Sequence, residues 1–167
     1  RSVADGIALL DELAAFEQMG QDTLPGAPRR LSRLGKRLAR LPIDPRLGRM
    51  VLEADRLGCA REVMIVAAVL SIQDPRERPA ETLEAATAAH QRFAGEDGSD
   101  FLTFVRLWDH LRARQRELTG NQFRRLCRDE FLNYLRVREW EDLFSQLRHI
   151  TSGLGIRLNT TPAHPDH

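Results

Sequence analysis

The chain has 167 residues, of which 42% are apolar and 29% are charged, and its formal net charge is +1. This is an ordinary globular composition, and the length suffices to bury a core without disulfides or a structural metal. Cys59 and Cys127 form no CxxC or Cys/His spacing, which indicates buried thiols in a reducing compartment. The longest apolar run, Val63–Leu70, is too short to span a membrane, and no signal peptide is visible, so we expect a cytoplasmic protein.

The small net charge conceals an uneven distribution along the chain. Residues 29–49 hold eight basic side chains against one acid, and residues 106–138 hold nine arginines against four acids. Of the 25 basic residues only Lys36 is a lysine. Arginine is favoured where planar contact with phosphate or carboxylate matters, although a GC-rich genome gives the same bias.

The N-terminal part predicts a small mixed unit. Ser2 and Asp5 have the spacing of a capping box for a helix that ends near Phe16. Residues 18–30 are rich in Gly, Pro and polar side chains, which predicts a loop or the tip of a short hairpin. Ser32 is then expected to cap a second short helix.

Helical periodicity dominates from Asp44 onward. Asp44-Pro45 predicts the start of a helix that ends at Gly58 and whose apolar residues are Leu47, Met50, Val51, Ala54 and Leu57. Residues 61–72 are apolar on nearly all sides, which predicts a central helix surrounded by others.

Further helices are predicted in the second half of the chain. They are expected over 81–93, from Ser99 or Asp100 with Phe101, Phe104, Val105, Trp108 and Leu111 facing inward, around 123–131, and around 140–150. Residues 156–167 are expected to be untethered. No strand pattern exceeds a few residues, so the sequence predicts a mostly helical domain after a small mixed piece.

Residues 34–50, LGKRLARLPIDPRLGRM, carry a specific resemblance. They are similar to the junction of winged-helix and ratchet domains in DEAH-box helicases, which commonly reads LTPLGRxLAxLPxDPRLxxM. The resemblance covers roughly residues 3–150, and the loop 73–79, QDPRERP, is similar to the bacterial HrpA type. Later segments that fit are 100–102, 107–108, 121–127, 130–136, 138–140 and 146–147.

The resemblance implies a mainly α fold with three parts. These are a partial winged-helix domain at 1–44, a helical-bundle, ratchet-like helicase-associated (HA2) domain of about six or seven helices at 45–152, and a tail at 153–167.

The sequence contains no GxxxxGK[ST] motif and no DEAH acid pair. We therefore expect no catalytic residue, cofactor or metal in this chain. The resemblance implies that two RecA-like motor domains, which bind ATP and Mg, precede it in a parent ATP-dependent 3′–5′ RNA helicase, a nucleoside-triphosphate hydrolase.

The basic run 29–49 could bind nucleic acid through phosphate neutralisation, the alternative being a solvated helix face and loop. Two further groups of side chains are candidates for contact with nucleic acid. Near a helix start preceded by Asn121, Arg124, Arg125 and Arg128 combine basic charge with helix N-terminal amides, which suits a sugar-phosphate backbone. The second group is Gln73, Arg76 and Arg78 in the 73–79 loop. The alternative for the first group is salt bridges with Asp129, Glu130 or neighbours, and for the loop arginines it is bracing of helix ends. Trp108, Tyr134 and Trp140 are expected in the core rather than stacked on bases.

The function implied by the resemblance is an accessory module of an RNA helicase. It would contact the backbone of single-stranded RNA, with DNA as an alternative, and couple movement of the RecA-like domains of the same chain to unwinding. No membrane partner is expected. Two other hypotheses stay open: a protein-interaction or regulatory helical module without nucleic-acid contact, and a winged-helix DNA-binding regulator with a helical effector domain.

Overall fold

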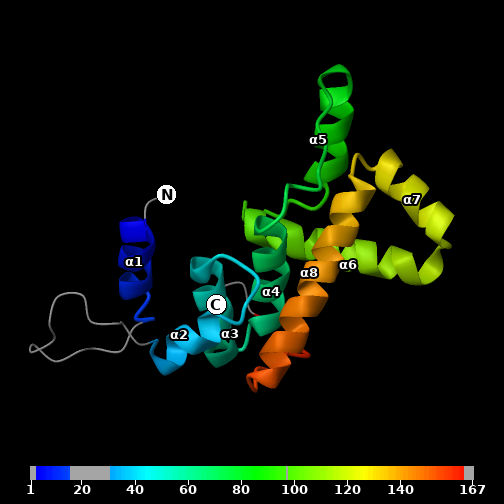
Figure 1. Cartoon of the computed structure of the whole chain (residues 1–167). Coiled ribbons are helices and arrows are strands. Elements are labelled where there is room, and N and C mark those ends of the chain that lie inside the picture. The colour runs from blue at the N-terminus through cyan, green and yellow to red at the C-terminus, as the bar shows by residue number, and fades with distance from the viewer. Residues whose placement is uncertain (1–2, 16–30, 97, 164–167) are drawn as a thin grey trace, which may run out of the picture.

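Helices build the part of the chain that the structure, a computed structural model, describes, namely residues 3–15, 31–96 and 98–163. In chain order they are α1 (Val3–Glu12), α2 (Arg33–Leu38), α3 (Pro45–Leu57), α4 (Ala60–Leu70), the 3-10 turn η1 (Ala80–Thr82), α5 (Leu83–Gln91), α6 (Asp100–Glu117), α7 (Gly120–Asp129) and α8 (Tyr134–Gly153) (Figure 1). Within those ranges there is no strand, and an isolated antiparallel bridge joins Arg76 to Leu132. The predicted mainly α fold is confirmed.

Helix α4 is the centre of the core, as its all-round apolar sequence predicts. It packs against α3, α6 and α8, and seven of its residues, Ala60 and 64–69, are buried. Burial on several faces requires neighbours on several faces, which explains why α4 lies between the other helices (Figure 1). The indole N–H of Trp140 in α8 donates a hydrogen bond to the carbonyl of Ile65 in α4 over 3.0 Å.

An aromatic cluster joins α6 to α8 beside this contact. The Trp108 ring lies 5.0 Å from the Trp140 ring and 4.7 Å from the Phe144 ring, between centroids. Trp108 and Trp140 are both buried, so their predicted core position is confirmed. Aromatic pairs at these separations add to the energy of area burial.

Several predicted helix ends are present. The Ser32 hydroxyl accepts a hydrogen bond from Gly35 N at 3.0 Å, and the Asp44 carboxylate accepts one from Arg46 N at 2.8 Å. Gly58 ends α3 in the left-handed conformation, with φ of 73°, and Ser99 caps α6. These signals lie within a few residues of the groups they satisfy, which is why sequence alone predicts them.

The first helix ends earlier than predicted. It stops at Glu12 rather than near Phe16, because Ala14 adopts a positive φ of 54° and turns the chain toward α2. The Ala15 carbonyl then accepts a hydrogen bond from Ser32 N at 2.8 Å. The predicted capping residue Ser2 and the predicted loop or hairpin at 18–30 lie outside the described residues, as does Phe16 itself.

Some apolar residues assigned to the core are exposed instead. Phe101 is 51% exposed, and Met50 and Leu57 are also exposed although they share the apolar stripe of α3. Helical spacing identifies residues that share a face, but it does not say how far along the helix a neighbour covers that face.

The prediction of an untethered C-terminal segment is wrong for residues 156–163. Ile156 is only 4% exposed, and the Asn159 side chain accepts a hydrogen bond from Arg61 N at 2.9 Å. The reason is that α4 lacks a capping side chain of its own, since its N-cap residue is Cys59. Asn159 satisfies one of the free amides at the start of α4 from 98 residues away. Residues 164–167 are outside the described part.

None of the described helices is both long enough and apolar enough to cross a membrane. The predicted boundaries at 44 and 152, and the winged-helix character of the N-terminal unit, stay predictions.

Candidate nucleic-acid interface

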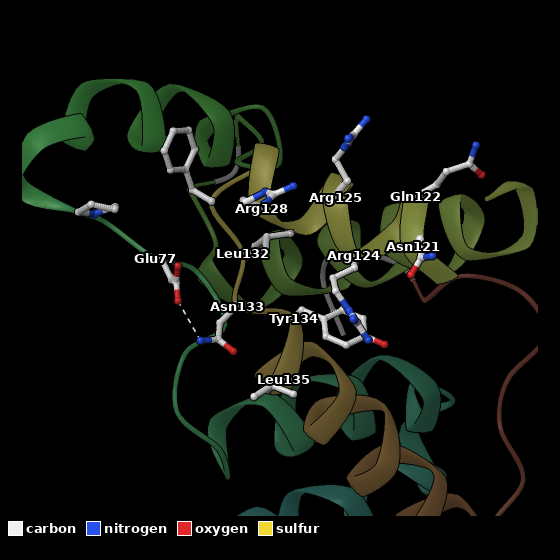
Figure 2. Close-up of a pocket in the computed structure, with 12 residues that line it drawn as sticks. Glu77, Asn121, Gln122, Arg124, Arg125, Arg128, Leu132, Asn133, Tyr134 and Leu135 are labelled. Atoms are coloured by element: carbon white, nitrogen blue, oxygen red, sulfur yellow. Dashed lines mark hydrogen bonds between the residues drawn. The ribbon is translucent and has the colours of Figure 1, made fainter. Parts of the chain in front are cut away.

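A surface groove of about 830 Å³ brings together four of the seven residues predicted to contact RNA (Figure 2). These four, Asn121, Arg124, Arg125 and Arg128, all lie on α7. The opposite side is formed by the start of α8 and by the loop before η1. Its further lining residues are Glu77, Pro79, Gln122, Phe131, Leu132, Asn133, Tyr134 and Leu135.

The sequence of α7 fixes which side chains face the groove. Thr119 and Gln122 form a reciprocal capping box at its start. Asn121 therefore lies inside the helix, whereas the sequence predicted it to lie just before the helix start. Phe123 and Cys127 are buried against the core. Because i and i+4 positions share a helix face, the arginines at 124, 125 and 128 are left on the exposed side.

The three arginines have few competing partners. The Arg124 guanidinium lies over the Tyr134 ring, 4.8 Å from its centroid. No ion pair joins Arg124, Arg125 or Arg128 to an acid among the residues that the structure describes. The expected alternative, salt bridges to Asp129 or Glu130, is not what the structure has: Glu130 pairs with other side chains.

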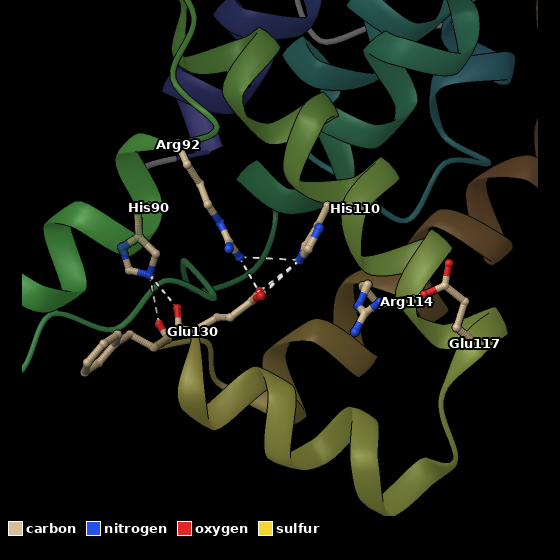
Figure 3. Close-up of polar contacts among 7 residues, drawn as sticks. His90, Arg92, His110, Arg114, Glu117 and Glu130 are labelled. Carbon is tan, nitrogen blue, oxygen red and sulfur yellow. Dashed lines mark hydrogen bonds and ion pairs between the residues drawn. The ribbon is translucent and has the colours of Figure 1, made fainter.

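The side chains that pair with Glu130 hold the C-terminal end of α7 in place (Figure 3). The Glu130 carboxylate is 2.5 Å from a nitrogen of Arg92 on the chain after α5, and 3.0 Å from Nε2 of His110 on α6. Nε2 of the buried His90 lies 3.1 and 3.0 Å from the carbonyl oxygens of Glu130 and Phe131. Burial lowers the pKa of His90, so its ring is neutral and donates Nε2–H to these carbonyls.

The loop on the other side of the groove is joined to the start of α8. Asn133 caps α8 by accepting a hydrogen bond from Arg136 N, and its Nδ2 donates to the Glu77 carboxylate at 2.9 Å (Figure 2). Two backbone bonds, Glu77 N to the Phe131 carbonyl and Asn133 N to the Pro75 carbonyl, are each 2.8 Å long. A positive φ of 54° at Phe131 makes the turn between α7 and α8.

Comparison with known proteins agrees with this architecture. Residues 44–104 match the family described as Helicase associated domain (HA2), ratchet-like. The chain contains a ratchet-like helicase-associated domain. Together with the similarities to HrpA helicases given below, this match confirms the resemblance to DEAH-box helicases of the HrpA type.

The similarity to individual proteins extends beyond the HA2 match. The chain is 50% identical over 163 residues to ATP-dependent RNA helicase HrpA of Escherichia coli, which covers 98% of this chain and 12% of that protein. It is 48% identical over 163 residues to the ATP-dependent RNA helicase HrpA homolog of Haemophilus influenzae, with the same coverage. A plant protein, DExH-box ATP-dependent RNA helicase DExH3 of Arabidopsis thaliana, is 33% identical over 116 residues, or 70% of this chain and 9% of that protein. The chain thus spans about an eighth of the length of the bacterial relatives.

The three loop residues predicted to contact RNA, Gln73, Arg76 and Arg78, do not line the groove. The Arg76 side chain is only 13% exposed, contacts the Asp74 carboxylate at 2.9 Å and lies over the Phe104 ring at 4.4 Å. Burial by itself raises the pKa of Asp74, but the hydrogen bonds and charge of Arg76 outweigh it, so that pKa is below its usual value. Gln73 and Arg78 are exposed, with Arg78 between the two loop residues that border the groove.

Sequence reasoning missed most of the opposite side of the groove. Tyr134, expected in the core, is half-buried and lies beneath Arg124, and Leu135 is 75% exposed. Asn133 before an amphipathic run was a usable signal for a helix start. Glu77 had no signal, since its partner is 56 residues away.

Proposed function

We propose that this chain is an accessory module of an ATP-dependent RNA helicase, and that the groove along α7 binds the sugar-phosphate backbone of single-stranded RNA. One observation carries the proposal: three exposed arginines without acidic partners in the described structure border one groove. Guanidinium groups bind phosphate oxygens in a bidentate manner. An anionic ligand would also relieve the repulsion among the three charges.

The composition of the groove favours backbone contact over reading of sequence. Its donors are mainly guanidinium groups and the Asn121 and Gln122 amides. Contacts to phosphate fix position but carry no base identity. We therefore expect sequence-independent binding, with Leu135 available to the sugars or base faces.

The proposal extends to the parent protein, since the relatives are named ATP-dependent RNA helicases. In it, RecA-like motor domains of the same chain would bind ATP and Mg and move along RNA in the 3′ to 5′ direction. The helical domain at 45–152 would form one side of the channel, and a winged helix that includes residues 1–44 would transmit the motor movement.

A protein-docking role without RNA contact is the second candidate. It is favoured by the exposed apolar side chains Leu83 and Phe101, on α5 and the first turn of α6. Helix α5 projects from the other helices (Figure 1), which would make it accessible to a partner. Exposed apolar surface of this kind often marks an interaction site.

A salt titration tests the RNA proposal and separates the two candidates. Log K for single-stranded RNA should fall linearly with log salt, with a slope of about −0.7 per phosphate contacted. Reversing Arg124, Arg125 and Arg128 to Glu should lower affinity and reduce the slope by about 2, since three contacts are lost.

A matched control reverses three exposed arginines elsewhere, Arg40, Arg46 and Arg49, and so also tests the basic run at 29–49. The groove variant should lose much more affinity than the control. Equal losses of RNA affinity in both variants would refute the assignment of the groove. So would a chain that binds a protein partner but no RNA.

A further inference from the structure

A second pocket, of about 440 Å³, lies between the C-terminal half of α6 and the middle of α8. It shares no residue with the α7 groove. Four arginines line it: Arg61 from α4, Arg112 and Arg116 from α6, and Arg148 from α8. Its acids are Asp109 and Glu141, and its rings are Trp108 and Phe144.

The positive charge in this pocket exceeds what its acids neutralise. Arg61 is hydrogen-bonded to Asp109, and Arg112 bonds Gln115 at 2.9 Å. Arg116 and Arg148 have no ion pair or hydrogen bond within the described ranges. The pocket therefore has an excess of two positive charges, which matches the charge of about −1.5 to −2 on a phosphate monoester at neutral pH.

The pocket also contains an acceptor without a donor. Glu141 is 8% exposed, and its Oε2 accepts a hydrogen bond from Arg138 at 3.5 Å. Its Oε1 is buried without a hydrogen bond, 3.7 Å from the nearest Arg112 nitrogen. Burial raises the pKa of this carboxyl group. A buried acceptor left unpaired costs free energy, so a ligand that supplies an N–H group would be stabilised here.

Aromatic rings lie next to these polar groups. The Trp108 and Phe144 centroids are 4.7 Å apart, and the Arg112 guanidinium is 6.0 Å from the Trp108 ring. Trp108 is buried in the core, so the half-buried Phe144 ring is the one that a ligand can reach. An aromatic side chain accepts the face or edge of a flat ring, including a nucleobase.

We infer that the pocket between α6 and α8 binds a mononucleotide, whose phosphate contacts Arg116 and Arg148 and whose base lies against the Phe144 ring with an N–H group directed to Glu141. A bare phosphate would leave the Phe144 ring and Glu141 unused. An acidic peptide would bring carboxylates beside Glu141, and a stable peptide interface needs far more surface than a pocket of this size. Small-molecule pockets begin at about 300 Å³.

Direct binding to the 167-residue chain tests this inference. Adenosine and guanosine monophosphate should bind more tightly than inorganic phosphate, measured by calorimetry and by quenching of tryptophan fluorescence. The Arg116→Gln, Arg148→Gln double variant should bind the mononucleotides at least about tenfold more weakly, because it loses charge-assisted hydrogen bonds. Both side chains are exposed, so the fold should not change.

Two further variants sharpen the test. Arg124→Gln with Arg128→Gln, in the α7 groove, is the matched control and should leave mononucleotide affinity unchanged while weakening RNA binding. Glu141→Leu should weaken mononucleotide binding but not phosphate binding, with circular dichroism to confirm folding. Competition by a 5′-phosphorylated oligonucleotide, compared with its 5′-hydroxyl form, distinguishes a strand end from a free nucleotide as the source of the ligand.

Three results would overturn the inference. They are equal affinity for phosphate and mononucleotides, equal mononucleotide affinity in the wild type and the Arg116/Arg148 variant, and binding of hexaglutamate without binding of mononucleotides. Loss of RNA binding in the α7 variant with mononucleotide binding retained would leave both proposals standing separately.

Discussion

Asn159 provides a direct test of how the end of the chain stabilises the core. Its Oδ1 accepts a hydrogen bond from Arg61 N at 2.9 Å, and its Nδ2 donates to the Glu62 carboxylate at 2.8 Å. Both partners lie in the first turn of α4, the helix on which the other core helices pack. The same Nδ2 also donates to the Thr161 carbonyl at 2.9 Å. Asn159→Ala removes these three bonds and leaves an amide at the start of α4 unsatisfied.

The size of the effect follows mainly from the two contacts with α4. Loss of a helix cap costs about 0.5–2 kcal/mol. The bond to Glu62 adds less than a buried charged hydrogen bond would, because Asn159 is only partly buried. We expect Asn159→Ala to lower the free energy of unfolding by about 2 kcal/mol, which corresponds to a fall in Tm of roughly 4–8 °C for a domain of this size.

Urea unfolding followed by circular dichroism measures this difference. Thr160→Ala, at an exposed neighbouring position, is the control and should stay within about 0.5 kcal/mol of the wild type. Asn159→Asp keeps the acceptor for Arg61 but places a carboxylate beside Glu62, so it should also destabilise. If Asn159→Ala is as stable as the Thr160 control, the distant cap contributes nothing and the reasoning is wrong.

Three other substitutions test separate parts of the fold. Gly35→Ala should destabilise by more than about 2 kcal/mol in thermal unfolding, because a Cβ there would lie 1.9 Å from the carbonyl oxygen of Ala15. A neutral result would contradict this close approach of Ala15, in the segment after α1, to α2. Burial lowers the pKa of His90, so the stability tied to its neutral ring is complete above pH 6.5 and is lost as pH falls below that value. Urea midpoints at pH 7.5 and 5.5 should therefore differ less in His90→Gln than in the wild type or in the exposed-site control His149→Gln. An unchanged pH dependence in His90→Gln would exclude this role. Trp140→Phe should cost about 1–3 kcal/mol, because the core loses the indole hydrogen bond to the Ile65 carbonyl and the volume of the second ring, and a loss below about 0.5 kcal/mol would contradict this.

Local rules account for what the sequence predicted well. Ser32, Asp44 and Gly58 mark helix ends through bonds or dihedral angles set within a few residues. The α4 segment was identified as central because no face of it is polar enough for solvent. The spacing of Arg124 and Arg128 likewise places them on one exposed face of α7, whatever that face binds.

Long-range contacts explain what the sequence did not reveal. Glu77 reaches the groove through Asn133, and Asn159 caps α4 from the far end of the chain. Neither pair has a sequence spacing that a local rule could recognise. Arg76 was predicted to contact RNA, and here the partner is close in the sequence. Its guanidinium instead donates a hydrogen bond to Asp74, two residues earlier in the same loop.

The contacts at the two ends of α7 bear on how the groove would work during the motor cycle of the proposed helicase. Its start is fixed by the Thr119–Gln122 capping box, and its end by His90 and by the Glu130 pairs with side chains of α6 and the α5 segment. A helix held at both ends presents its arginines at constant spacing. Since phosphates repeat regularly along a strand, such a surface would, under the proposed function, bind the backbone equally well at successive registers. Movement during a motor cycle would then displace the domain as a unit relative to the RNA, rather than rearrange α7 within it.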